Sequence, residues 1–168
     1  LSSGSWTQLG SDVNGEASND ESGYSVSLNS DGDRMAIGAP YNDGTGSNAG
    51  HVRIYEYSGG SWSQLGSDID GEASWDESGC AVSLNNAGDR VAIGAKYNGD
   101  GNAGHTRVYA YSDNAWTQLG SDIDGEADSD NSGWSVSLND AGDRVAIGAY
   151  YNDGNGTNAG HTRVYAYS

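Results

Sequence analysis

The sequence predicts an all-β repeat protein, because one pattern of residues occurs three times within 168 residues. The segment Trp6–Asp12 returns with small changes at Trp62–Asp68 and again at Trp116–Asp122. Glycine is abundant, with 27 residues, whereas phenylalanine is absent and Tyr and Trp supply the aromatic surface. Glycine suits tight turns, and aromatic and β-branched residues suit strands. A repeat of this length indicates units that bury their apolar faces against neighbouring units.

Each unit is expected to contain four short strands separated by turns. In the first complete unit, residues 24–29 alternate between apolar and polar side chains, whereas residues 35–39 are apolar on both faces, as in a strand covered from both sides. Residues 52–57 alternate again. The fourth strand, residues 61–69, carries regularly spaced apolar side chains and ends in an Asp-Gly turn.

The links between these strands fit an antiparallel meander, because the first link contains a hairpin-type glycine. A four-stranded sheet that is apolar on both faces must stack on its neighbours, and radial stacking gives a β-propeller. The expected fold is therefore all-β, with β-propeller blades of four antiparallel strands and three blades per chain. In chain order, the expected parts are a strand at 5–13 that is equivalent to the fourth strand of a blade (a fourth-type strand), blades at 22–69 and 78–123, and an incomplete blade at 132–168.

The repeated residues resemble the FG-GAP repeat, which forms the blade of integrin-type propellers. The resemblance rests on Ser22–Val26, Ala36–Pro40 and Gly50–Tyr55 and covers essentially the whole chain. It implies an extracellular location if the protein is natural. The family's Phe is replaced by Ser22, and the acidic calcium loop that many members carry between the first two strands is shorter here. A calcium ion needs six to eight oxygen ligands, so we expect no calcium site in that link.

The chain is expected to assemble with itself, because it opens with a fourth-type strand and closes with a blade that lacks one. Three blades are too few to close a ring. A second chain is therefore expected to supply the missing strand, head to tail, which also covers an exposed strand edge. Two chains would give six blades, which we favour, and three chains would give nine. The residues expected at this contact are Trp6, Leu9, Val13, Val164 and Tyr165.

A net charge of −17 argues against nucleic acid and against anionic membranes as partners. No run of eighteen apolar residues predicts a membrane span. Cys80 is the only cysteine, so no disulfide can form within the chain. Six of the seven basic residues are arginines that recur in register, and we expect them to pair with in-register aspartates. The arginines are Arg34, Arg90, Arg144, Arg53, Arg107 and Arg163, and the aspartates are Asp33, Asp89 and Asp143 or Asp12, Asp68 and Asp122.

The positions at which the three units differ most in side-chain size define a candidate ligand site. They follow the fourth and the second strand of each unit, and in a meander these links lie on one face of the propeller, where ligands commonly bind. Exposed aromatic rings beside acids and amides could stack on sugars or hold a peptide. Tolerated substitution in loops is the alternative explanation. The candidate residues are Tyr24, Trp75, Lys96, Trp134 and Tyr150.

His51, His105 and His161 recur once per unit, so we expect a structural hydrogen bond for each and no shared metal ion. The acidic turn at 68–76, repeated at 122–130, is expected to be solvated, with a weak cation site as the alternative. No catalytic residue, metal site or cofactor is predicted.

The preferred function is a self-assembling, non-enzymatic propeller scaffold. The alternative is an extracellular binding module that recognises carbohydrate or a protein surface. The near-identity of the copies fits either recent duplication or engineering.

Overall fold

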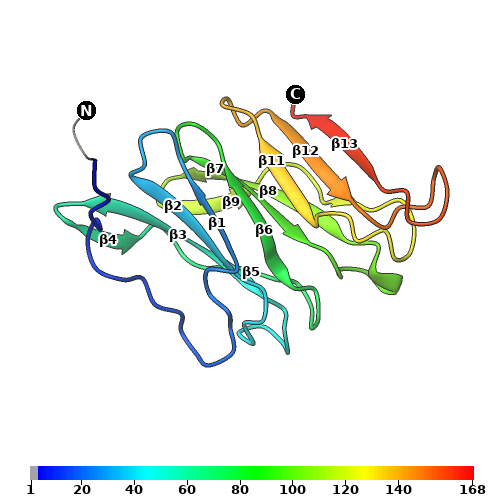
Figure 1. Cartoon of the computed structure of the whole chain (residues 1–168), viewed down its shortest axis with the longest axis horizontal. Helices are drawn as coiled ribbons and strands as arrows, with labels where there is room; N and C mark the ends of the chain where they lie inside the picture. Colours follow the sequence, from blue (N-terminus) through cyan, green and yellow to red (C-terminus); the bar gives the residue numbers. More distant parts are fainter. Residues whose placement is uncertain (1–3) are drawn as a thin grey trace.

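The computed structural model describes residues 4–168, and for Asp100 its backbone alone. It contains three antiparallel sheets arranged side by side, which confirms the all-β expectation (Figure 1). Strands account for 41% of the chain and helix for 1%. No helix among the described residues is long and apolar enough to cross a membrane.

Each of the first two sheets follows the expected meander. The first comprises β1 (Ser25–Leu28), β2 (Arg34–Ala39), β3 (His51–Ser58), β4 (Ser61–Gln64) and β5 (Ile69–Asp70). The second comprises β6 (Ser78–Leu84), β7 (Arg90–Ala95), β8 (His105–Ser112), β9 (Ala115–Gln118) and β10 (Ile123–Asp124), with the short 3₁₀ helix η1 (Asp100–Asn102) between β7 and β8. The third comprises β11 (Ser135–Leu138), β12 (Arg144–Ala149) and β13 (His161–Ala166), and has three strands.

The expected fourth strand, residues 61–69, is divided into two pieces that both pair with the third strand. β4 pairs with the end of β3 and β5 with its beginning. Between them the chain turns at Gly66, whose φ of 78° lies in the left-handed region that favours glycine. The turn places Asp68 near the start of β3, 3.7 Å from the ring of His51.

The core lies between the sheets, because each sheet covers one face of the next. Ile54 and Ile69 of the first sheet pack into one cluster with Leu84 and Ile93 of the second. A similar but smaller cluster joins the second sheet to the third, around Ile147. Close approach requires small residues: a Cβ at Gly38 would collide with the backbone of Gly79.

The first strands of the three sheets, β1, β6 and β11, lie side by side. Backbone hydrogen bonds connect the turns that follow them, from the Ser30 N–H to the Asn86 carbonyl and from the Asn86 N–H to the Asp140 carbonyl, both at 3.1 Å. The Ser25 hydroxyl adds a hydrogen bond of 2.8 Å to the Gly79 carbonyl. The first strands therefore form the inner side of an arc of sheets, and the fourth strands form its outer side.

Residues 5–13, expected to form a strand, adopt none within the single chain. A strand needs a neighbouring strand for its hydrogen bonds, and no described strand pairs with this segment. The segment instead lies against the first sheet, where its Leu9 carbonyl accepts a hydrogen bond of 2.9 Å from the Trp62 indole N–H. It thus contacts the first sheet as residues 61–70 contact the second.

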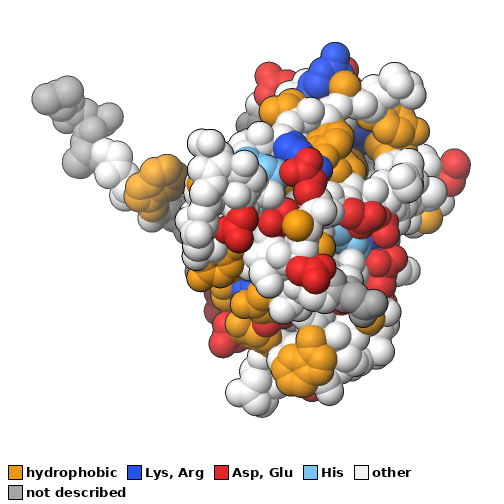
Figure 2. Space-filling model, turned by 90° about the vertical axis from the view of Figure 1, so that its right-hand side faces the viewer, with side chains coloured by type: hydrophobic (Ala, Val, Ile, Leu, Met, Phe, Trp, Pro, Cys, Tyr) orange, Lys and Arg blue, Asp and Glu red, His pale blue; other side chains and the backbone are white. Residues whose placement is uncertain are grey.

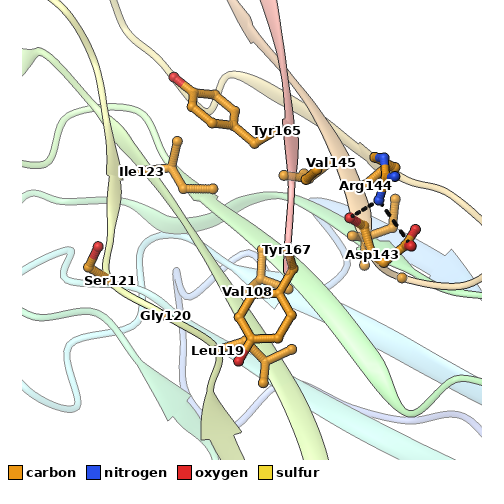
Figure 3. A pocket seen from close by; sticks show the side chains of 13 residues that line it. Val108, Leu119, Gly120, Ser121, Ile123, Asp143, Arg144, Val145, Tyr165 and Tyr167 are labelled. Atoms are coloured by element: carbon orange, nitrogen blue, oxygen red, sulfur yellow. Dashed lines mark hydrogen bonds and ion pairs between the residues drawn. The ribbon is translucent and has the colours of Figure 1, made fainter.

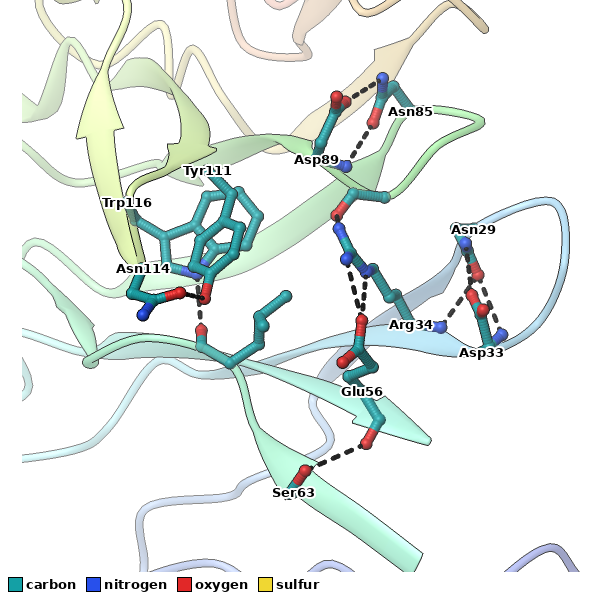
Figure 4. Close-up of polar contacts among 12 residues, drawn as sticks. Asn29, Asp33, Arg34, Glu56, Ser63, Asn85, Asp89, Tyr111, Asn114 and Trp116 are labelled. Carbon is teal, nitrogen blue, oxygen red and sulfur yellow. Dashed lines mark hydrogen bonds and ion pairs between the residues drawn. The ribbon is translucent and has the colours of Figure 1, made fainter. Parts of the chain in front are cut away.

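The expected pairing of arginines with in-register aspartates is wrong for most of them. Arg34 pairs with Glu56 at 2.8 Å, as Figure 4 shows, while Asp33 accepts a hydrogen bond from the Asn29 amide. Arg144 does contact Asp143, at 3.0 Å. The arginines of the third strands pair with glutamates that follow the fourth strand of the preceding unit, as in the 3.3 Å contact between Arg53 and Glu16. The stacking of the sheets brings these glutamates within reach of the arginines. The alignment of residues within one unit does not reveal this pairing.

Leu84→Ala should destabilise the protein by about 2–5 kcal/mol, the range for removing a buried leucine side chain. Leu84 is 7% exposed and belongs to the cluster between the first two sheets. Thr117→Ala, at an exposed position on β9, is the control and should change stability by less than about 0.5 kcal/mol. Urea unfolding of both variants checks this. Equal stability of the two variants would show that this junction is not a packed core.

Candidate functional site

A repeated packing motif joins neighbouring sheets at their outer edge, and we call it the tryptophan pocket. At the first junction, the Trp116 indole N–H donates a hydrogen bond of 2.7 Å to the Leu65 carbonyl (Figure 4). The ring covers Gly66, where an added Cβ would lie 2.8 Å from it, and it packs on Tyr111 with ring centroids 5.1 Å apart. A Leu-Gly step and a tyrosine thus hold the indole.

The same pocket is formed by the N-terminal segment on the first sheet. Trp62 bonds to the Leu9 carbonyl, packs on Tyr57 at 5.1 Å, and lies 3.1 Å from where a Cβ of Gly10 would be. The tryptophan pocket therefore has the same partners in two consecutive places.

The third tryptophan pocket contains no indole. A cavity of about 170 Å³ lies between the second and third sheets, lined by Leu119, Gly120 and Tyr167 among others (Figure 3). The nearest atom to an added Cβ at Gly120 would belong to Tyr167, at 3.8 Å. The repeat equivalent of Trp62 and Trp116 is Trp6, whose side chain is fully exposed at 104%.

The third strand of the last sheet has one open edge. β3 and β8 each pair with strands on both sides, whereas β13 pairs only with β12 among the described strands. Tyr57 lies opposite Trp62 and Tyr111 opposite Trp116. If a segment equivalent to residues 5–13 paired with β13 in the same register, Tyr167 would lie opposite the tryptophan equivalent to Trp6.

The predicted assembly residues occupy both ends of the arc. Trp6 and Leu9 are exposed at one end, with Val13 partly buried beside them, and Val164 is 68% exposed at the other. Tyr165 faces inward instead: it packs toward the second sheet and lines the third tryptophan pocket (Figure 3).

A second candidate site is an aromatic cluster around Lys96, and it contains four of the five predicted ligand residues. The Lys96 ammonium lies 4.8 Å from the Trp134 ring centroid and 5.7 Å from that of Tyr24, and the Trp134 ring packs at a tilt on Tyr150, with centroids 4.5 Å apart. A cavity of about 120 Å³ separates Tyr24, Cys80, Lys96 and Trp134. These residues meet because the first strands lie side by side: Cys80 is on β6, and Tyr24 and Trp134 directly precede β1 and β11.

Trp75 does not join this cluster. It is 62% exposed in the link before β6, and its backbone N–H bonds to the Ser47 carbonyl. Glu77, which is not among the residues predicted from the sequence, forms a buried ion pair of 2.7 Å with Lys96. Lys96 is the one basic residue that is not a repeated arginine, and this could have prompted a search for its acidic partner.

The Lys96 charge is held within the protein rather than presented to solvent. Burial lowers the pKa of its ammonium, but the hydrogen bond and charge of Glu77 outweigh burial and leave this pKa above its ordinary value. The charge of Glu77, together with burial, raises the pKa of Tyr41. The cluster therefore combines a neutralised cation with exposed aromatic rings, which suits stacking on a ligand more than ion binding.

His51 and His105 each lie beside two carboxylates and His161 lies beside one, and for His105 the expected hydrogen bond is absent. His105 is 1% exposed, and neither of its ring nitrogens has a hydrogen-bond partner. Its Nδ1 lies 3.8 Å from Glu72 and 3.9 Å from Asp122. Burial, together with the charge of Arg107, lowers the pKa of His105, which keeps its imidazole neutral near pH 7.

Comparison with known proteins decides the family. The model of the FG-GAP repeat matches residues 12–55 and 122–167, together more than half of the chain. The chain belongs to the FG-GAP repeat family. No curated protein sequence matches it.

Several solved structures share the fold of this FG-GAP repeat chain at low identity. A Bacteroides uniformis protein assigned as a 6-phosphogluconolactonase is 10% identical with a TM-score of 0.56, and covers 84% of this chain and 35% of its own. The Pseudomonas aeruginosa periplasmic gluconolactonase is 13% identical with a TM-score of 0.54, covering 85% and 39%. Hydrazine synthase of Kuenenia stuttgartiensis is 14% identical with a TM-score of 0.50, covering 85% and 45%.

The FG-GAP chain therefore spans less than half the length of each of these structures. These structural matches show a propeller-like fold. At identities of 10–14%, they do not assign the activity of any of these proteins to this chain.

Cys80 should be protected from alkylation in the folded protein. Burial raises the pKa of its thiol to about 11, and the thiol hydrogen-bonds to the Gly94 carbonyl at 3.3 Å. At pH 8 its thiolate fraction should be roughly 200-fold below that of an unfolded chain with a pKa of about 8.5. Iodoacetamide labelling, followed by mass spectrometry with and without denaturant, measures this ratio. Equal rates in the two conditions would contradict the burial.

The same pKa predicts a loss of stability in alkali. Because the folded chain holds the thiol proton more tightly, the contribution of Cys80 is complete below about pH 8.5 and falls as the pH rises toward 11. Cys80→Ala removes this contribution, so the difference in unfolding free energy between wild type and variant should shrink over that window. A constant difference from pH 8 to 11 would argue against a raised pKa.

Proposed function

We propose that this chain is a self-assembling scaffold, in which copies join head to tail into a closed β-propeller without catalytic activity. The observation that carries the proposal is the third tryptophan pocket, which contains no indole while the equivalent Trp6 is fully exposed. For the 168-residue chain, a second copy supplies Trp6 to this pocket and residues 5–13 to the open edge of β13. Two chains give a six-bladed ring, which we favour over three chains and nine blades.

The two outer faces of the chain are complementary by repeat equivalence. The leading face of the first sheet carries Val26, Leu28 and Met35, and the trailing face of the third sheet carries Ala146, Thr162 and Val164. Equivalents inside the chain are more buried. Leu84 is 7% exposed against 58% for Leu28, and Ile54 is 0% exposed against 68% for Val164. Docking the trailing face of one copy on the leading face of another would bury these side chains too, and full burial of a Val, Leu or Met side chain contributes about 1.5–3 kcal/mol.

The polar contacts across each junction also extend to the outer faces. The Ser27 hydroxyl accepts the backbone N–H of Leu84, and the Ser83 hydroxyl accepts that of Leu138, both at 3.0 Å. By the same repeat, Ser137 faces outward in position to accept the backbone N–H of Leu28 from a second copy. These bonds fix the register of the docking, because a shift by one residue would lose them all.

Val164→Asp should prevent assembly while leaving the single chain folded, because Val164 is exposed in that chain. Thr117→Asp adds the same charge at an exposed position away from both faces and should assemble as wild type. Sedimentation velocity at about 0.15 M salt makes the comparison, since the Debye length of about 8 Å then screens the repulsion between chains of charge −17. Circular dichroism confirms folding. Identical sedimentation of both variants would refute docking through the trailing face.

A second function, binding of carbohydrate or a protein surface, is favoured by one specific observation. Trp134, Tyr150 and Tyr151 are exposed and pack together in tilted pairs, with ring centroids 4.5 and 3.9 Å apart. Such a platform offers apolar faces of the kind that sugars stack on. Membership of the FG-GAP family favours an extracellular location, where glycans are available.

Trp134→Ala should weaken any glycan binding by this platform, whereas Trp75→Ala, at an exposed tryptophan outside it, should have no effect. A glycan array probed with wild type and both variants measures this. Losing one aromatic ring should weaken binding by at least about two- to tenfold, since such contacts contribute about 0.5–1.5 kcal/mol beyond area burial. Absence of any bound glycan, or equal loss in both variants, would leave the scaffold as the function.

A further inference from the structure

Two clusters of one histidine and two carboxylates form where consecutive units meet. The first joins Glu16, His51 and Asp68, and the second joins Glu72, His105 and Asp122. In each cluster the ligand atoms lie within 4.8 Å of one another. Glu72 follows the fourth strand of the preceding unit, and Glu16 follows the equivalent N-terminal segment 5–13. The histidine begins the third strand, and the aspartate precedes the second piece of the fourth strand. Each cluster therefore draws on three separate segments.

The spacing of these atoms suits a shared cation better than hydrogen bonds. His51 Nδ1 lies 3.8 Å from Glu16 Oε2 and 3.7 Å from Asp68 Oδ2, and His105 shows 3.8 and 3.9 Å. These distances are too long for hydrogen bonds. Ligands about 2.0–2.1 Å from a tetrahedral zinc ion stand roughly 3.3–3.4 Å apart, so a small inward movement would bring them into coordination.

The buried imidazole of His105 is an independent indication of a ligand. Both of its ring nitrogens are buried without a hydrogen-bond partner, and Nδ1 points at the two carboxylates. Leaving a buried polar atom unpartnered carries a desolvation penalty of about 1–3 kcal/mol. A bound cation would remove that penalty at Nδ1.

We propose that these two clusters are zinc sites, each with one imidazole, two carboxylates and a water molecule as ligands. An imidazole nitrogen suits zinc and disfavours calcium and magnesium, which prefer all-oxygen ligands. Arg107 lies 3.5 Å from Glu72 Oε1, and Arg53 lies 3.3 Å from Glu16 Oε1. The arginine holds one glutamate oxygen and leaves the other, Oε2, directed at the histidine, as an outer-shell partner does around a metal. This proposal revises the sequence-based expectation of no metal site.

A third site of the same kind would be shared between chains. His161 Nδ1 lies 3.5 Å from Glu126 Oε2. The repeat equivalent of Asp68 and Asp122 is Asp12, which lies at the far end of the arc in the segment that we assign to the partner's third sheet. This part rests on the proposed head-to-tail assembly. Zinc at the shared site would tighten that assembly, because the ion binds only to the joined form.

Isothermal titration of the metal-free full chain with zinc chloride near pH 7.5 tests the sites. Asp122→Asn removes one ligand from the His105 cluster, and Asp124→Asn removes the same charge two residues away, at an exposed position. We expect zinc affinity at one site to fall at least about tenfold in Asp122→Asn and to be unchanged in Asp124→Asn. Co²⁺ in place of zinc should give the visible absorption of a tetrahedral nitrogen and oxygen site.

Absence of zinc binding tighter than about 1 mM, equal losses in the two variants, or calcium binding as tight as zinc would overturn the proposal. Stoichiometry separates this outcome from failure of the assembly. Wild type should bind three zinc ions per chain and the non-assembling Val164→Asp two. Two ions per chain in both would keep the zinc sites and refute only the shared one.

Discussion

The structure depends on the contact between one sheet and the next, because a sheet with apolar residues on both faces is stable only when both are covered. Small residues set the distance: Gly38 meets the backbone of Gly79, and Ala36 and Ala92 are completely buried. At the outer edge, the tryptophan of each fourth strand covers the Leu-Gly step of the preceding one and hydrogen-bonds to its leucine carbonyl. Apolar packing, backbone hydrogen bonds and the tryptophan pocket thus all connect each sheet to the next sheet along the chain, always through the same two faces.

This one-way arrangement explains why the two ends of the chain differ from its middle. Equivalent side chains of different units are buried where a neighbouring sheet covers them and exposed where none does, as Leu84 and Leu28 show. Figure 2 shows a view in which acidic side chains are spread over the surface and basic ones are few. In the proposed assembly, apolar docking and backbone pairing would have to hold copies of net charge −17 together against their mutual repulsion.

Much of the fold could be predicted from the sequence, because strand alternation and turn residues are local signals. Three features could not. Gly66 divides the fourth strand, yet a glycine in a strand pattern does not reveal whether it bends the chain or only allows a close approach. The glutamate partners of Arg53 and Arg107 come from the preceding unit, so their pairing depends on how the sheets stack. Trp75 and Trp134 both stand out as unit-specific residues, but only Trp134 faces the region where the first strands converge.

The candidate sites show the same division between local and stacking-dependent information. The sequence repeat identifies Trp62 and Trp116 as equivalents of Trp6, so Trp6 could be predicted. The pocket at Gly120 is formed by two sheets and is seen only in the structure. The recurrence of one histidine per unit indicates only that the three histidines lie apart around the propeller. It does not reveal that different segments bring two carboxylates to His51 and two to His105.

Native mass spectrometry of the wild-type chain at micromolar concentration tests the central claim most directly. Completion of the third sheet by a second copy predicts one closed species at twice the chain mass of 17.4 kDa, with no open series of larger oligomers. A species of three chains would keep head-to-tail completion and replace the six-bladed ring with nine blades. A folded species at 17.4 kDa alone would contradict the account.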